Sequence, residues 1–379
     1  MKKSSLSKLT QSVHAGSVGD SQYKGAVTPI YPSSAYDYQD IPEILYPRYF
    51  NTPNQRAVAE KIAALENAED GLIFSSGMSA IMTTLFALLK KGDHAVFQSD
   101  LYGGTMHAVN TEFLRFGIEC TFVDGSVPEN FEKAIRPETK VIYIETPSNP
   151  TLKITDLKAV ASIAKRHEVT TVIDNTFASP VNQNPIDQGI DIVAHSGTKY
   201  IGGHSDICCG AVVASKGWID KIRKSAVNTG GSLDAHTSWL VERSLKTIVL
   251  RVRQQNQNAL AIAEYLVTDQ RIDRVYYPGL SSHPDHAIAK AQMPGGFGGM
   301  LSFEVKDNAF KFMDRLKLIK RAVSLGGVES TITSPAQTSH SKISAAERAS
   351  LGIKDSLVRL SVGIEETEDL INDIKQALA

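Results

Sequence analysis

Six short apolar runs alternate with helical patterns between residues 94 and 215, and this alternation restricts the possible folds more than any other feature. Helical spacing connects several of the runs, for example over residues 155–167. Because parallel strands need long crossover connections, which are usually helical, the alternation predicts an α/β protein with a mostly parallel sheet. The runs cover residues 94–100, 119–125, 140–147, 170–176, 191–197 and 210–215.

Polar side chains follow three of these runs at their carboxyl ends. Glu145 lies at the end of the third run and Asn149 follows it, and Asp174 lies at the end of the fourth. Ser196 lies at the end of the fifth run, and Lys199 follows it. Ligands of open parallel sheets bind at the carboxyl ends of the strands. The three polar ends together therefore predict a functional site at this edge of the sheet.

Lys199 and Asp174 have unusual surroundings for charged residues. Lys199 lies among serine, threonine and glycine in the segment HSGTKYIGGHSD. A surface-loop lysine is the alternative, but these neighbours suit close packing of backbone around an anion. Asp174 follows the apolar residues of TTVI, so it must be paired or bear a large desolvation cost. A helix cap or a structural salt bridge is its alternative role.

A third feature completes a recognisable combination. Residues 75–79, SSGMS, begin a helical pattern, so free N–H groups and the positive end of the helix dipole would face an anion there. Pyridoxal phosphate needs a lysine for its Schiff base, a carboxylate beside its protonated pyridine nitrogen and donors for its phosphate. Tyr102, after the first apolar run, offers a flat partner for the ring. The sequence therefore predicts pyridoxal 5'-phosphate as the cofactor.

The length of 379 residues suggests two domains. Residues 1–55 are rich in Ser, Tyr and Pro and predict an extended arm that contacts a neighbouring subunit. Residues 56–254 are expected to form the large cofactor-binding domain, and residues 255–379 a smaller α+β domain. A long helical pattern over residues 239–269 leads from one to the other.

Composition excludes several classes of function. The formal net charge of −1 gives no electrostatic case for nucleic acid or an anionic membrane. Three cysteines are too few for a disulfide framework and lack zinc spacing, so no metal is expected, and Cys208 and Cys209 are interpreted as small buried hydrophobes. No secretory signal or membrane span is visible, which predicts a cytoplasmic protein.

A set of motifs connects these features to a known family. YPR, SSGMSA, LYGGT, ETPSNP, VIDNTFASP, HSGTKYIGGHSD, SLGGVES and VRLSVGIE occur in one order along the chain. In that order they resemble the Cys/Met-metabolism family of pyridoxal-phosphate enzymes, which includes cystathionine γ-synthase, cystathionine β- and γ-lyases, methionine γ-lyase and homoserine-ester sulfhydrylases. The resemblance implies the aminotransferase-like fold (fold type I) and a homotetramer whose active sites are shared between subunits.

The resemblance also implies a role for each matching residue toward the cofactor. Lys199 would hold the cofactor and transfer protons, and Asp174 would pair with the pyridine nitrogen. Tyr102 would stack on the ring and assist proton transfer. The residues that would hold the phosphate are Gly77, Met78, Ser196 and Thr198, together with Tyr46 and Arg48 reaching across from a neighbouring subunit.

A second group of residues would hold the amino-acid substrate. Arg359 would bind the α-carboxylate bidentately, helped by Asn149 and the main chain of Ser324. A surface arginine at a sheet edge is the alternative, but Arg359 has apolar neighbours on both sides. Tyr46 and His107 would border the substrate, although His107 could equally cap a helix.

Several positions depart from the family pattern. Phe50 replaces the glycine that usually follows the YPR-like motif. Val323 stands where γ-synthases and cystathionine γ-lyases often carry glutamate, which favours a β-lyase or a methionine γ-lyase type of pocket. Gly104, however, stands where methionine γ-lyases tend to carry cysteine, and His107 replaces an arginine found in many γ-synthases.

We therefore expect a pyridoxal-phosphate-dependent carbon–sulfur lyase that cleaves L-cystathionine-like substrates by β- or γ-elimination. The products would be a thiol, ammonia and a 2-keto acid. The alternatives are a cystathionine γ-synthase or O-acylhomoserine sulfhydrylase, which join rather than cleave, and a methionine γ-lyase. A non-catalytic relative is disfavoured by the intact Lys199, Asp174, Tyr102 and Arg359. A nicotinamide dehydrogenase is disfavoured because no GxGxxG motif follows a predicted strand.

Overall fold

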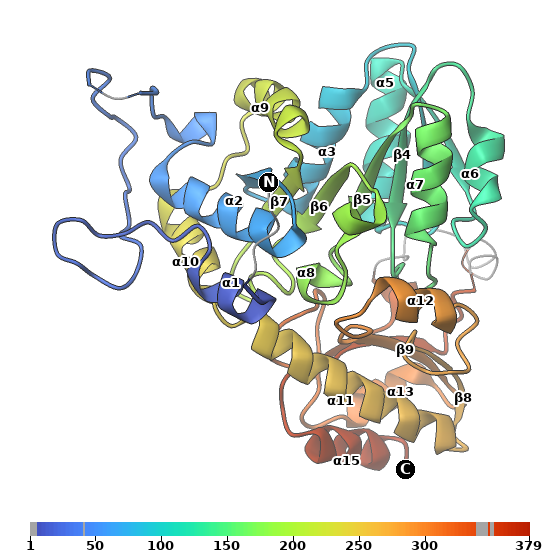
Figure 1. Ribbon diagram of the computed structural model, residues 1–379. Coiled ribbons are helices and arrows are strands. Elements are labelled where there is room, and N and C mark those ends of the chain that lie inside the picture. Colours follow the sequence, from blue (N-terminus) through green and yellow to red (C-terminus); the bar gives the residue numbers. More distant parts are fainter. Residues whose placement is uncertain (1–5, 41, 339–347, 349–351) are drawn as a thin grey trace.

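The computed structural model describes residues 6–40, 42–338, 348 and 352–379, which form a large unit and a smaller C-terminal unit (Figure 1). The large unit is built on a seven-stranded sheet with the order β1-β7-β6-β5-β4-β2-β3. In this sheet β7 runs antiparallel to β1 and β6, and the other neighbours are parallel. The strands are β1 (Asp70–Phe74), β2 (His94–Gln98), β3 (Glu119–Val123), β4 (Thr139–Glu145), β5 (Thr170–Asp174), β6 (Ile192–Ser196) and β7 (Gly210–Ala214).

The α/β fold with a mostly parallel sheet is confirmed. Each of the six apolar runs contains one strand, from β2 to β7. Strand β1 was not predicted, because its five residues DGLIF show no alternation and lie at the edge of the sheet, where they pair with β7. The antiparallel direction of β7 was also not predicted, because an apolar run does not indicate whether its strand is parallel or antiparallel to its neighbours.

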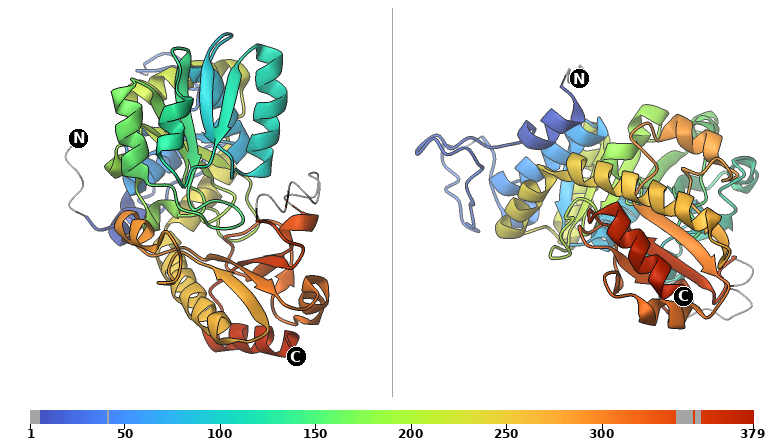
Figure 2. Two further views of the ribbon diagram at one scale, coloured as in Figure 1. Left: turned by 90° about the vertical axis from the view of Figure 1, so that its right-hand side faces the viewer. Right: turned by 90° about the horizontal axis from the view of Figure 1, so that it is seen from below.

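Helices cover both faces of the large sheet, which explains why its strands are apolar on both sides (Figure 2). One face packs against α2 (Pro53–Glu66), α7 (Leu157–Arg166) and α10 (Ala235–Leu245). The other face packs against α3 (Gly77–Leu88) and α9 (Lys216–Thr229). The shorter helices are α4 (Gly103–Ala108), the π-helix η2 (Val109–Phe113), α5 (Leu114–Phe116), α6 (Glu129–Ala134), α8 (Ser179–Asn182) and η3 (Pro185–Gln188).

The alternation of side chains along β5 decides which face its last residue meets. Ile173 belongs to the core under α2 and α7, whereas Val172 belongs to the core under α3 and α9. Successive side chains of a strand point to opposite faces, so Asp174 lies on the same face as Val172. The acid at the end of β5 is therefore directed to the α3 side of the sheet.

The C-terminal unit is a five-stranded sheet with the order β10-β11-β12-β9-β8. Its core packs under α11 (Ile248–Thr268), α13 and α15, and α11 and α15 lie side by side in Figure 2. The elements are β8 (Ile272–Tyr276), α12 (His286–Gln292), β9 (Met300–Val305), α13 (Ala309–Arg315), β10 (Lys320–Arg321), β11 (Thr331–Thr333), η4 (Pro335–Gln337), β12 (Leu357–Ser361) and α15 (Thr367–Ala377).

Helix α11 (Ile248–Thr268) connects the two units. Its first turns, with Ile248 and Val252, pack in the core of the large unit, whereas Ile262 and Leu266 pack in the C-terminal core. The single helix expected over residues 239–269 is divided, because α10 ends at Leu245 before α11 begins. The domain limits after residues 55 and 254 stay predictions.

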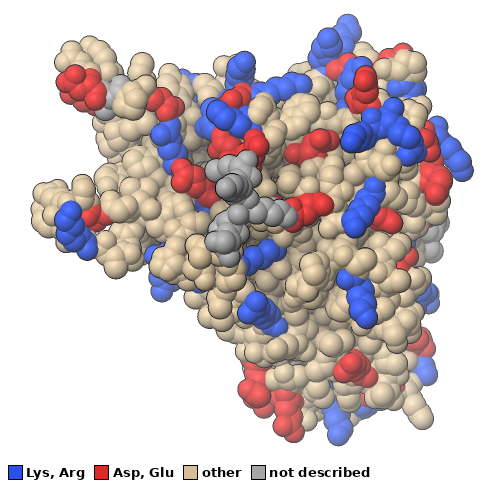
Figure 3. Space-filling view, in the orientation of Figure 1, with Lys and Arg blue, Asp and Glu red and all other residues tan. Residues whose placement is uncertain are grey.

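The segment before α2 contains α1 (Lys8–His14) and the 3₁₀ helix η1 (Pro47–Tyr49). Between these two helices the chain extends away from the large unit (Figure 1). This stretch exposes large apolar side chains, among them Tyr23, Val27, Tyr38 and Ile44. Basic and acidic side chains are interspersed on the face shown in Figure 3. Within the described part of the chain, no helix combines the length and apolar character needed to cross a membrane.

We predict that Leu301→Ala lowers the free energy of unfolding by about 2–5 kcal/mol, because Leu301 is fully buried in the C-terminal core. The matched control is Leu114→Ala, since the Leu114 side chain is 81% exposed and its removal should cost under about 0.5 kcal/mol. Urea unfolding followed by circular dichroism measures both effects. Equal destabilisation by the two variants would contradict the assigned core.

Candidate active site

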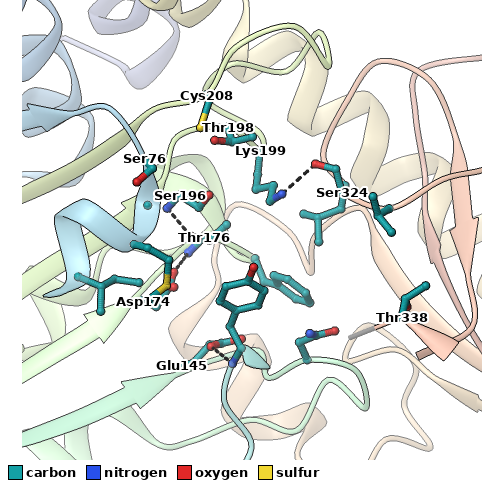
Figure 4. Close-up of a pocket in the computed structure, with 18 of the residues that line it drawn as sticks. Ser76, Glu145, Asp174, Thr176, Ser196, Thr198, Lys199, Cys208, Ser324 and Thr338 are labelled. Carbon is teal, nitrogen blue, oxygen red and sulfur yellow. Dashed lines mark hydrogen bonds between the residues drawn. The ribbon is translucent and has the colours of Figure 1, made fainter. Parts of the chain in front are cut away.

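A cavity of about 690 Å³ lies at the carboxyl ends of β4, β5 and β6, between the start of α3 and the C-terminal unit (Figure 4). It is the place where the chain gathers most of its predicted site residues. The ten that line it are Gly77, Met78, Tyr102, Asn149, Asp174, Ser196, Thr198, Lys199, Ser324 and Arg359.

Strand pairing brings the polar strand ends together. Glu145 at the end of β4 pairs in register with Asp174 at the end of β5, and Asp174 pairs with Ala194 of β6. Ser196 ends β6, and the turn that follows carries Lys199. The expectation that three polar ends meet at one edge of the sheet is thus confirmed by the register of neighbouring parallel strands.

Lys199 is held by a contact with the C-terminal unit. Its Nζ donates a hydrogen bond of 2.8 Å to Oγ of Ser324, which Figure 4 shows across the cavity. Ser324 has a φ of 77°, a left-handed conformation that is strained for a residue other than glycine. Burial lowers the pKa of Lys199 and the Arg359 cation lowers it further, while Cys208 and Asp174 act in the opposite direction. The neutral amine is therefore favoured relative to an ordinary lysine, as a nucleophile or a base requires.

Asp174 is a buried carboxylate held by a threonine. It accepts the main-chain N–H of Thr176 at 3.0 Å, and Oγ1 of Thr176 accepts the main-chain N–H of Ser196 at 2.8 Å. Burial raises the pKa of Asp174, whereas the Thr176 hydrogen bonds and the charges of His195 and Lys199 lower it. Among the described residues, no cation lies within ion-pairing distance of this carboxylate. A cationic ring nitrogen of a ligand would supply the partner that the fold does not.

An anion cradle lies where α3, β6 and β7 converge. Oγ of Ser76 caps α3 by accepting the N–H of Ser79 at 3.1 Å, while the earlier N–H groups of the first turn have no intrahelical partner. A Cβ on Gly77 would stand 2.8 Å from Cβ of Ser196, and one on Gly210 would stand 2.1 Å from the carbonyl oxygen of Ser76. These glycines allow the close approach of three backbone segments, which suits a phosphate at the helix N-terminus.

Arg359 lies in β12 on the opposite wall of the cavity. Its Nη1 donates to Oδ1 of Asn149 at 2.7 Å and its Nη2 to the carbonyl oxygen of Ser324 at 3.4 Å. Its Nε is buried without a hydrogen-bond partner. Burial lowers the pKa of Arg359 to about 10, so the guanidinium stays charged at neutral pH. A buried guanidinium with an unused donor fits the carboxylate of a substrate.

These features together fit pyridoxal phosphate on physical grounds. One cavity contains an amine with a lowered pKa and a buried carboxylate that forms no ion pair with a described residue. It also contains a helix N-terminus that other backbone segments approach closely because glycine residues lack a side chain. Among the described residues, no group of three or more His, Cys, Asp and Glu side chains has the arrangement of a metal site. The donor set therefore matches an organic phosphate with a cationic ring.

Three predicted residues do not line the cavity. Arg48 donates from Nη1 to the carbonyl oxygen of Val227 at 2.6 Å, on α9 of its own chain, and Tyr46 lies next to it. His107 lies exposed on α4. The roles expected for Tyr46 and Arg48 involve a neighbouring subunit and stay predictions.

Other residues line the cavity without a predicted role, among them Glu145, Thr176, Phe177, Cys208 and Gln337. The interpretation of Cys208 as a buried hydrophobe is wrong, because its side chain is exposed and borders the cavity beside Thr198 (Figure 4). Cys209 is buried, as expected. The main-chain N–H of Cys209 donates to Oγ1 of Thr198 and its side chain packs in the core, whereas the side chain of Cys208 borders the cavity.

Known proteins match the chain over its whole length. The profile of the family described as "Cys/Met metabolism PLP-dependent enzyme" matches residues 9–379. Cystathionine gamma-lyase of Bacillus subtilis is 46% identical over 98% of this chain and 99% of its own, and cystathionine beta-lyase of Lactococcus lactis subsp. cremoris is 45% identical over 97% and 98%. The crystal structure of cystathionine gamma-lyase from Lactobacillus plantarum complexed with L-serine superposes with a TM-score of 0.94 at 40% identity, covering 98% of each chain.

We predict that Gly77→Ala weakens retention of pyridoxal phosphate by about tenfold or more, because the new Cβ would meet the Ser196 backbone at 2.9 Å. Gly217→Ala on α9 is the matched control, since a methyl group at position 217 would meet no atom within 4 Å. Equilibrium dialysis with the free cofactor measures retention, and circular dichroism verifies that both variants fold. Unchanged retention in Gly77→Ala would contradict the anion cradle.

Proposed function

The chain belongs to the Cys/Met metabolism family of pyridoxal-phosphate-dependent enzymes, and from this premise we propose how its residues cleave a carbon–sulfur bond. It is a pyridoxal-phosphate-dependent carbon–sulfur lyase of sulfur amino-acid metabolism, of the cystathionine lyase type. The proposed residue roles rest on one observation, which is that Lys199, Asp174 and Arg359 line the same cavity.

The cofactor would be held at three points. Lys199 would bind it covalently through Nζ, and Asp174 would pair with the protonated ring nitrogen. The phosphate would accept hydrogen bonds at the start of α3, from Gly77 and Met78, and from the hydroxyl groups of Ser196 and Thr198. When bound, pyridoxal phosphate supplies an electron sink for negative charge that develops at the substrate Cα. The buried position of Asp174 strengthens its attraction for a cationic ring.

The substrate would be oriented by its α-carboxylate. Arg359 would receive this carboxylate, with the amide of Asn149 and the main chain of Ser324 fixing the plane of the guanidinium. The Lys199 amine, whose pKa is lowered by burial and by Arg359, would accept the Cα proton at Nζ. Ser324 contacts both Lys199 and Arg359, so a single residue sets the distance between the base and the carboxylate anchor.

Elimination then needs an acid for the departing sulfur. Protonated Lys199 and the Tyr102 hydroxyl are the groups proposed to move this proton. Breaking the Cβ–S bond gives pyruvate after release of ammonia, and breaking the Cγ–S bond gives 2-oxobutyrate. Relatives named as gamma-lyase and as beta-lyase are almost equally similar to this chain. Cleavage of a carbon–sulfur bond is common to both names, whichever of the two bonds is broken.

The wall near Tyr102 supports a cystathionine-type substrate over methionine. A Cβ on Gly104 would stand 2.5 Å from Cε1 of Tyr102, so the ring fills the space that a side chain at position 104 would need. Methionine γ-lyases tend to carry cysteine at this position. Val323 on the cavity wall supplies no charge for a distal ammonium, which leans toward the β-lyase outcome.

The proposal includes a homotetramer with shared active sites that acts in the cytoplasm. The exposed apolar side chains of the arm, such as Tyr23 and Tyr38, support burial against another subunit. Tyr46 and Arg48, which lie in the same arm, would reach the phosphate of that subunit. The free thiols of Cys120, Cys208 and Cys209 are consistent with a reducing compartment.

We predict that the protein with pyridoxal phosphate converts L-cystathionine to either homocysteine and pyruvate or cysteine and 2-oxobutyrate. Lys199→Ala should lower this rate by at least about a hundredfold and remove the near-ultraviolet absorbance of the lysine-bound cofactor, because the base and the covalent attachment are both lost. Lys216→Ala is the matched control and should behave as wild type, because the Lys216 side chain is 70% exposed on α9. Formation of cystathionine from an activated homoserine and cysteine, without cleavage, would overturn the lyase assignment.

For the arm, we predict that Arg48→Ala lowers cofactor retention by about tenfold, because a phosphate contact from a neighbouring subunit is lost. The matched control is Arg115→Ala, since the Arg115 side chain is 72% exposed on α5. Retention is measured by dialysis of the assembled protein, with its mass determined by light scattering. If Arg48→Ala keeps both its cofactor and its activity, the residue serves only contacts within its own chain, such as those with Val227 and Tyr46, and the shared-site role is wrong.

A further inference from the structure

Glu145 and Asp174 form a pair of buried carboxyl groups at the ends of two adjacent strands. They are in register on β4 and β5, they are 3% and 5% exposed, and both line the cavity. The proposed function uses Asp174 and leaves Glu145 without a role. Two ionised carboxylates in such a position would repel each other in a medium that screens charge poorly.

No cation of the described residues forms an ion pair with Glu145. The charged groups that face it are Asp174 from β5, Asp100 from the loop after β2 and Arg359 from β12. Asp100 is itself paired with Lys153 at 2.7 Å. Arg359 donates instead to Asn149 and to the main chain of Ser324. Glu145 thus has two acids and one engaged cation around it.

The two carboxyl groups differ in how well the fold supports a negative charge. Burial raises the pKa of Asp174 as well, but its carboxylate accepts the N–H of Thr176 and lies near Lys199 and His195, which favour its ionised form. Glu145 accepts a single N–H, from the main chain of Tyr102 at 2.8 Å. Burial and the Asp174 charge raise the pKa of Glu145 well above its usual range. The hydrogen bonds and nearby groups of the fold therefore support a negative charge better on Asp174 than on Glu145.

We propose that Glu145 is a positioning residue that works as a neutral carboxylic acid: it leaves Asp174 as the single negative charge of the pair, and its Oε2 fixes the main chain that carries Tyr102. This role rests on the proposed function of Asp174 and Tyr102. Glu145 acts through these two residues and not on the substrate. Its main chain is held by Gln98, whose Oε1 accepts the Glu145 N–H at 2.9 Å and whose Nε2 donates to the Glu145 carbonyl at 2.7 Å.

Two conservative variants separate a neutral role from an anionic one. Glu145→Gln stays neutral and keeps the length of the side chain, so its amide oxygen can accept the Tyr102 N–H. Glu145→Asp keeps the acid but is one methylene shorter, so it withdraws from Tyr102. If the site requires a negative charge at position 145, Glu145→Asp should be the more active variant. If Glu145 works as a neutral positioning residue, Glu145→Gln should be the more active variant.

The first measurement is the infrared difference spectrum between the wild type and Glu145→Gln at neutral pH, recorded on the protein without cofactor. We expect the wild type to show one more carboxylic-acid carbonyl band and no more carboxylate bands than the variant. Other buried acids, such as Glu66 and Glu242, contribute equally to both proteins and cancel. Loss of carboxylate bands in the variant would mean that Glu145 is ionised and would overturn the proposal.

The second measurement is kcat/KM for L-cystathionine with the assembled protein and its cofactor. Glu145→Gln should exceed Glu145→Asp by about tenfold or more, because a small displacement of a catalytic group is costly. The reverse order would overturn the proposal. Wild-type cleavage is measured first, so a failure of the lyase assignment is seen there. The infrared comparison needs no substrate and decides the state of Glu145 in either case.

Discussion

The in-register pairing of β4 and β5 is the constraint on which the site depends. It fixes two carboxyl groups, Glu145 and Asp174, side by side where water cannot screen them. Around them the fold places the amine of Lys199, whose pKa is lowered, and the buried guanidinium of Arg359. Each of these buried groups costs desolvation energy in the protein alone, and a cationic ring with an amino-acid carboxylate offsets that cost.

The cavity exists because the C-terminal unit packs against the turn that carries Lys199. Gly326 has a φ of 77°, and a Cβ there would stand 2.8 Å from the main-chain nitrogen of Tyr200. Glycine therefore lets the SLGG segment approach this turn closely. The same segment presents Ser324, which bonds to Lys199 through Oγ and to Arg359 through its carbonyl oxygen. The contact between the two units therefore also forms part of the cavity wall.

Much of the site could be predicted because strand ends are local signals. Asp174 and Lys199 each follow an apolar run, and parallel strands bring such ends together whatever the details of the helices. The edge strand β1, the break between α10 and α11, and the exposure of Cys208 escaped prediction. The pairing of β1 with β7 and the position of Cys208 at the cavity depend on partners distant in the chain, and the pattern of a short segment carries no record of such partners.

The amino-acid sequence by itself determined which reactive side chains are present, how helices and strands alternate, and at which edge of the sheet the polar side chains lie. Only the tertiary structure decided which groups share a wall of the cavity and what charge they carry. Glu145 shows the difference: the sequence identifies it as an acid, but its burial and the neighbouring Asp174 raise its pKa well above the usual range. Protonation depends on burial and on charges from other strands, and these arise only when the chain is folded.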